Sequence, residues 1–81
     1  MSARIDPLDL AVSQILREKQ GEAGITGGFL SKKAEIHPRT LLRILNGERA
    51  ATLGELRALA LVLRTTASAI ATEAEGVVKN V

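Results

Sequence analysis

The 81-residue sequence contains no cysteine, tryptophan or tyrosine, and it has only one phenylalanine and one histidine. The absence of cysteine excludes a disulfide framework, a thiolate zinc site and a cysteine nucleophile. Because a lone histidine (His37) is not a metal site, we expect neither metal nor cofactor. With so few aromatic residues, the core must consist of Leu, Ile, Val and Ala, which favours packed helices over a β-sandwich.

Long apolar runs are also missing. None approaches the roughly 18 residues of a membrane-spanning helix, and the N-terminus lacks the apolar region of a signal peptide. We therefore expect a cytoplasmic protein without membrane contact. Proline occurs only at positions 7 and 38, and both suit the first residue of a helix. Together these features predict an all-α fold, with residues 1–81 forming one small domain.

The formal net charge is only +2, but the basic residues are clustered. Between residues 32 and 49, five basic residues (Lys32, Lys33, Arg39, Arg43, Arg49) face two acidic ones (Glu35, Glu48). A basic patch on a nearly neutral body is a modest electrostatic signal for nucleic acid. Charged runs are more often simply solvated, so the patch alone decides nothing.

Five helices are expected. The first begins at Asp6-Pro7 and ends near Lys19, before a polar loop from Gln20 to Gly24. Thr26 caps the second, and an Asn46-Gly47 ending closes the third, which begins at Pro38. Thr52-x-x-Glu55 forms a capping box for the fourth, and Thr65 or Thr66 opens the fifth. The residues expected to face the core are Leu8, Val12, Ile15, Leu16, Phe29, Leu30, Ala34, Leu53, Leu56, Leu59, Ala60, Leu63, Ala67, Ile70, Ala71 and Ala74.

The segment from Pro38 to Asn46 has two chemically different sides. Leu41, Ile44 and Leu45 share one helical stripe that can pack inward. Arg39, Arg43 and Asn46 form an opposing stripe of long or forked hydrogen-bonding groups. Such groups suit reading base edges and contacting phosphates, so we interpret this segment as a DNA-recognition helix. The alternative is a solvated face with incidental pairs, such as Arg39 with Glu35.

Two positions near this segment leave alternatives open. Gly27 and Gly28 lie at the start of the second helix, where they either expose backbone N–H groups to a phosphate or fray the helix. His37, in the turn Glu35-Ile36-His37, either contacts a phosphate or is merely solvated.

These segments together resemble the phage repressor and Cro-type (XRE-like) helix-turn-helix family over roughly residues 16–70. The resemblance rests on Thr26, Leu30-Ser31, Ile36 and Leu41-x-x-Ile44-x-Asn46-Gly47, followed by the leucine spacing of residues 53–63. It implies a compact five-helix, lambda-repressor-like domain with a helix-turn-helix core at about residues 25–47. The chain departs from the family at Gly27, where Gln is common, at Glu35, where Gly is usual, and in the longer loop before Ile25.

The resemblance also implies the site. Base contacts are expected at Pro38, Arg39, Thr40 and Arg43, and Leu42 can meet a thymine methyl group. By the resemblance, phosphate contacts are expected at Thr26, Gly27, Asn46 and Arg49, and from their own position and charge we add Lys32 and His37. The expected function is that of a phage- or prophage-type regulator, nucleoid-associated in the cytoplasm, which binds a pseudo-palindromic double-stranded DNA operator as a homodimer.

Apolar residues outside the core suggest how a dimer forms. Gly76 is expected to end or bend the last helix, which leaves residues 76–81 as a tail that pairs as a strand, extends the helix or is disordered. The expected dimer contacts are Leu61, Val62, Ile70, Val77, Val78 and Val81. The same apolar positions suit the alternative function, an antitoxin-like module whose main partner is another protein. An enzyme is not expected, because no nucleophile, histidine pair, carboxylate cluster or phosphate-binding loop is recognisable.

Overall fold

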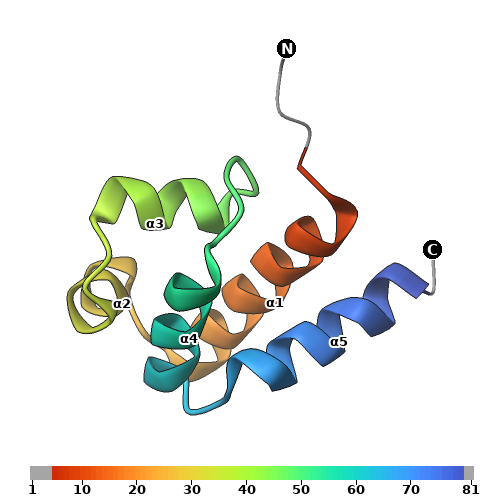
Figure 1. The fold of residues 1–81 in the computed structure, drawn as a ribbon. Coiled ribbons are helices and arrows are strands. Elements are labelled where there is room, and N and C mark those ends of the chain that lie inside the picture. The colour runs from red at the N-terminus through yellow and green to blue at the C-terminus, as the bar shows by residue number, and fades with distance from the viewer. Residues whose placement is uncertain (1–4, 80–81) are drawn as a thin grey trace.

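The computed structural model describes residues 5–79 and contains five helices in that range: α1 (Pro7–Ala23), α2 (Gly27–Ala34), α3 (Pro38–Leu45), α4 (Leu53–Val62) and α5 (Ala67–Lys79). No strand occurs among the described residues. The helices α1 and α5 run side by side in opposite directions, and α3 lies on the far side of the molecule from α5 (Figure 1). The predicted all-α, five-helix architecture is confirmed.

The first helix is longer than predicted. Asp6 caps α1 by accepting the backbone N–H of Leu8 at 2.8 Å, as expected. The helix then continues through Gly21 and ends only at Gly24, whose φ of +66° lets its N–H bond back to the carbonyls of the last turn. The prediction of a polar loop from Gln20 to Gly24 is therefore wrong. Gln20 remains helical, and its side chain donates to the carbonyl of Ile25.

The core contains most of the predicted residues, including Leu16, Leu30, Ile44, Leu59 and Ile70, which have no exposed surface. Two predictions are wrong: Phe29 is 48% exposed and Leu53 is 78% exposed. Both lie in the first turn of a helix, where the side chain projects beyond the packed interface. In α2 the inward position belongs to Ser31, whose hydroxyl donates to the buried Ile36 carbonyl.

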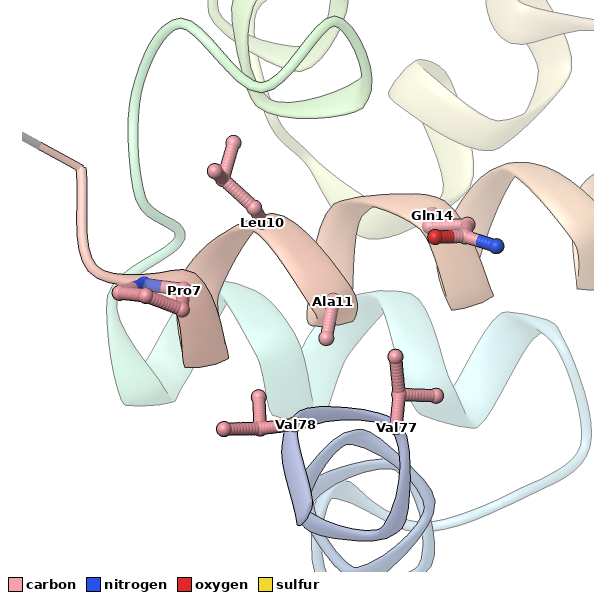
Figure 2. Close-up of a pocket in the computed structure, with 6 residues that line it drawn as sticks. All are labelled: Pro7, Leu10, Ala11, Gln14, Val77 and Val78. Carbon is pink, nitrogen blue, oxygen red and sulfur yellow. The ribbon is translucent and has the colours of Figure 1, made fainter. Parts of the chain in front are cut away.

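The last helix does not stop at Gly76. It continues to Lys79, so Val77 and Val78 belong to α5 rather than to a separate tail. Val78 packs against the core, whereas Val77 is 40% exposed. In Figure 2, Val77 points from α5 towards α1, while Val78 points to the side of α5 nearer Pro7. Val78 therefore has packing partners within the same chain, and Val81 lies outside the described residues.

Candidate nucleic-acid interface

The helices α2 and α3 are joined by a turn that the sequence sets locally. Glu35 ends α2 in the left-handed region with φ +57°, the conformation that glycine would favour at this position. Ile36 is buried beneath the turn, and Pro38 starts α3. At the N-terminus of α2, the hydroxyl oxygen of Thr26 accepts the Phe29 N–H at 3.1 Å. Gly27 and Gly28 are helical, so the frayed alternative does not apply.

The third helix shows the predicted division into two faces. Leu41, Ile44 and Leu45 are buried, while Arg39 and Arg43 are exposed. Asn46 is exposed directly after the helix, Leu42 is 58% exposed, and Thr40 is half-buried. Within residues 5–79 neither arginine side chain has a hydrogen bond or an ion pair. The structure therefore leaves the polar side of α3 available for a ligand.

The end of α3 is shaped by close packing as well as by backbone conformation. Gly47 has φ +72°, as predicted for a left-handed cap. A Cβ atom at this position would also lie 3.0 Å from Cδ2 of Leu10 in α1. Figure 2 shows Leu10 pointing away from the two valines of α5. The positive φ therefore favours glycine at position 47, and a Cβ there would also require the exposed Leu10 side chain to shift slightly, which was not visible in the sequence.

His37 has a structural role that sequence reasoning missed. Its Nδ1 atom accepts the backbone N–H of Arg39 at 3.1 Å and so caps α3. The contact orients the imidazole and makes Nδ1 an acceptor, which leaves Nε2 to carry the proton of the neutral ring. The signal was present in the sequence, since a polar residue directly before a helix-starting proline occupies the N-cap position.

Arg49 is not a free cation. Its guanidinium forms two hydrogen bonds with the Glu55 carboxylate, at 2.8 Å and 3.2 Å. These bonds hold the pKa of Glu55 below the ordinary value for a glutamate and raise the pKa of Arg49. Glu55 also accepts the Thr52 N–H in the predicted capping box, which is confirmed. The predicted phosphate-contacting residue is thus already engaged at the start of α4.

Acidic residues border the recognition helix more closely than the sequence suggested. Arg43 and Arg49 share an open hollow of about 350 Å³ with Asp6, Asp9 and Glu48. Asp6 and Asp9 come from the start of α1, some 40 positions from Glu48, so no local pattern could have brought them together. The carboxylates make this edge less positive than the count of basic residues between positions 32 and 49 implied.

The remaining predicted residues fall in several places. Lys32 is exposed on α2, beside the helix-turn-helix turn. The side chains of Val77 and Val78 help to line an apolar hollow of about 400 Å³ between α1 and α5, with Pro7, Leu10, Ala11 and Gln14 (Figure 2). Leu61 is 65% exposed on α4, and Val62 is half-buried. Ile70, a predicted dimer contact, lies entirely in the core and offers a partner no surface.

Two further findings apply to the described residues only. Within residues 5–79, no three histidine, cysteine, aspartate or glutamate side chains are grouped so that they could hold a metal ion. Over the same range, no helix combines the length and apolar character needed to cross a membrane.

The arrangement of α2, the turn and α3 is matched by a known family. The helix-turn-helix family profile aligns with residues 14–70, which is most of the chain. The chain belongs to the helix-turn-helix family. It is therefore a DNA-binding domain of the kind found in transcription regulators. No curated protein matches it in sequence.

Solved structures agree with the fold. One structure of the clp gene regulator ClgR from Corynebacterium glutamicum superposes with a TM-score of 0.80 at 20% identity, covering 90% of this chain and 78% of that one. A second ClgR structure superposes with a TM-score of 0.78 at 21% identity, covering 93% of this chain and 96% of that one. At this level of identity the likeness concerns the fold. It places the five helices of this chain in the same fold as ClgR.

Proposed function

We propose that this helix-turn-helix protein is a sequence-specific transcription regulator, of phage or prophage type, that binds a pseudo-palindromic operator as a homodimer. The observation that carries the proposal is the outer face of α3, where Arg39 and Arg43 are exposed and not engaged by other described residues. The proposed role is that of a cytoplasmic, nucleoid-associated binding protein rather than an enzyme. The resemblance of the fold to ClgR supports a regulatory role.

Direct readout would depend mainly on the two arginines. Each can pair bidentately with O6 and N7 of a guanine in the major groove, and a good pair contributes about 1–3 kcal/mol of discrimination. Pro38 has no N–H and Thr40 is half-buried, so both would contribute shape rather than strong hydrogen bonds. Leu42 supplies an apolar contact beside them.

The proposed phosphate contacts divide into two groups. Thr26, the N–H of Gly27, Lys32 and Asn46 lie at the exposed edges of the helix-turn-helix unit and would set its register on the duplex. His37 and Arg49 already have partners within the chain, which fix their orientation. Each of these two retains N–H donors that can reach a phosphate only in the direction its partner allows.

The size of the molecule is suitable for a dimer on DNA. Its principal extents are 32 × 29 × 20 Å. Two copies side by side can therefore insert α3 into successive major grooves, which are about 34 Å apart. One short recognition helix covers few base pairs, so useful specificity requires the second copy. The proposed dimer contacts with exposed surface are Leu61, Val62, Val77 and Val78.

Selection from a random duplex library tests this function. The selected site would then be titrated with purified protein at two salt concentrations, beside random DNA. We expect a two-fold symmetric consensus with half-sites about one helical turn apart. Weak, strongly salt-dependent binding without enrichment would instead indicate a generic basic patch and refute the proposal.

Replacing Arg43 provides a sharper test of direct readout. Arg43→Ala should weaken binding to the selected site by about tenfold or more, with a smaller effect on random DNA, because it removes a base contact. Electrophoretic titration of both DNAs measures the difference. Arg57→Ala is the matched control. Arg57 is an exposed arginine on α4, away from α3, and it lines a hollow together with Leu61. If Arg43→Ala weakened binding to the selected site and to random DNA equally, Arg43 would contact a phosphate and not a base.

The second candidate is an antitoxin-like module whose principal partner is another protein. It is favoured by the exposure of Leu61 and Val77, apolar side chains on two elements away from α3. Size-exclusion chromatography of the protein recovered from its native host distinguishes the candidates. A stoichiometric hetero-complex would support the module, whereas a homodimer that binds the selected site supports the regulator.

A further inference from the structure

An open hollow of about 230 Å³ lies where the start of α2 meets one flank of α3. Its lining consists of Gly27, Gly28, Pro38, Leu41, Leu42 and Leu45, and we call it the glycine hollow. No charged side chain contributes to its lining. Leu41 and Leu45 are buried, so they form its floor, while the more exposed Leu42 and Pro38 stand at its edge.

The hollow exists because two helical residues lack side chains. A Cβ atom built on Gly28 would have no neighbour within 4 Å, and one on Gly27 would meet only Gln20 Nε2, at 3.9 Å. Close packing therefore does not require glycine at either position. Neither residue has the positive φ that would favour glycine. The chain has two poor helix-forming residues here although a Cβ atom would fit at each.

The position of the hollow connects it to the proposed base-reading surface. Leu42 is the immediate neighbour of Arg43 and lies three residues after Arg39, so it shares the exposed side of the same two turns of α3. An apolar recess beside two guanine-reading arginines would face the edges of neighbouring base pairs. The 5-methyl group of thymine is the apolar feature that base edges present in the major groove.

We propose that the glycine hollow binds the 5-methyl group of a pyrimidine and makes this protein select thymine at one position of each half-site. The inference rests on the proposed function, because it requires α3 to lie in the major groove. The phosphate proposed to contact the Gly27 N–H is a poor occupant of the floor, where Leu41 and Leu45 leave a charge without compensation. Burying one methyl group corresponds to a preference of about fourfold over the unmethylated base.

Base analogues test the inference directly. In the selected operator, each thymine is replaced singly by uracil, which removes only the methyl group. We expect binding to fall about fourfold at one position per half-site and to change little at the others. At that position, 5-methylcytosine should bind better than cytosine, which separates recognition of the methyl group from recognition of the thymine O4 atom.

Two pairs of variants locate the effect. Gly28→Leu places a side chain at the mouth of the hollow, and Leu42→Ala removes part of its wall; both should abolish the difference between thymine and uracil. Their controls are Gly54→Leu and Leu53→Ala in α4. Gly54 is also the second residue of its helix and also has no neighbour within 4 Å of a built Cβ. Leu53 is even more exposed than Leu42.

The outcomes separate the inference from the function on which it rests. If no thymine in a selected site is sensitive to uracil, the inference is wrong although the protein remains a sequence-specific binder. The same conclusion follows if Gly28→Leu and Leu42→Ala keep the full methyl preference. If the library yields no site, the proposed function fails and the inference fails with it. Circular dichroism of each variant confirms that the helices are intact.

Discussion

Polar residues around the helix-turn-helix unit differ in how far the fold itself uses them. The imidazole of His37 caps α3, and the Arg49 guanidinium is paired with Glu55. Arg39 and Arg43 carry the same charge as Arg49, but the described residues do not engage their side chains. Residues that looked equivalent in the sequence therefore separate into those that hold the fold and those available for DNA.

Glu35 is one of two non-glycine residues with a positive φ among residues 5–79, the other being Arg64. A non-glycine residue in the left-handed region loses roughly 1 kcal/mol. Glu35→Gly should therefore raise the free energy of unfolding by about 1 kcal/mol or somewhat less, which urea denaturation measures. Glu35→Ala is the control, because it removes the carboxylate and keeps the Cβ atom. Equal stabilisation by both changes would show that charge, and not backbone strain, is responsible.

At the scale of helices, the start of α4 is the most elaborate terminus. Thr52 accepts the Glu55 N–H, Glu55 accepts the Thr52 N–H, and Arg49 from the preceding loop holds the same carboxylate. A capping box normally involves the helix alone. Here it also ties the loop after α3 to α4, so the electrostatics of one carboxylate affect the position of two elements.

This network predicts how stability depends on pH. The folded state lowers the pKa of Glu55, so the stabilisation is fully present above the ordinary glutamate pKa of about 4.5 and is lost as the pH falls through the folded value. Glu55→Gln keeps a capping side chain but cannot titrate. We expect the free energy of unfolding of wild type to exceed that of this variant by up to about 1 kcal/mol at pH 7, and this advantage to shrink as the pH falls below about 4.5.

Urea unfolding of the two proteins between pH 3 and pH 7 measures this difference. Other carboxylates titrate in the same range, but they are shared by both proteins and cancel in the comparison. A constant difference across the range would mean that Glu55 contributes through its shape only, and that its pairing with Arg49 does not depend on charge.

For the whole molecule, apolar surface remains exposed at both ends of α5. Val77 borders the hollow beside α1. Leu61 borders a second hollow that includes Ala67, the first residue of α5. The ten residues from Ala67 to Val77 correspond to about 15 Å of helix, so the two surfaces are separate. A symmetric dimer needs only one of these two surfaces. The proposed dimer interface therefore lies either at the hollow that Val77 borders or at the hollow that Leu61 borders.

Single charge substitutions should distinguish these alternatives. If the hollow beside α1 forms the interface, Val77→Glu should shift the protein to monomer in sedimentation equilibrium, while Leu61→Glu leaves the dimer intact. A dimer lost with Leu61→Glu alone would place the interface at the other end of α5. Val77 is preferable to Val78 for this test, because Val78 packs against the core and its replacement would also affect folding. A wild-type monomer at DNA-binding concentrations would exclude both interfaces.

Much of this architecture was predictable, because its signals are local in the chain. The capping residues Asp6, Thr26 and Thr52 and the prolines set where helices begin. The spacing of Leu41, Ile44 and Leu45 set which face of α3 is buried. These effects act over three or four residues, within the range that a helix itself connects. The family resemblance and the exposed arginines followed from the same local patterns.

Tertiary contacts decided the rest. They place Val78 beside α1 and bring Asp9 into the same hollow as Arg43. They also created the glycine hollow, where residues of α2 and α3 that carry no mutual sequence signal line one space. Each of these features depends on the relative placement of two helices. The order of residues in the sequence does not say how far apart two helices lie in space, so only the folded structure could show these features.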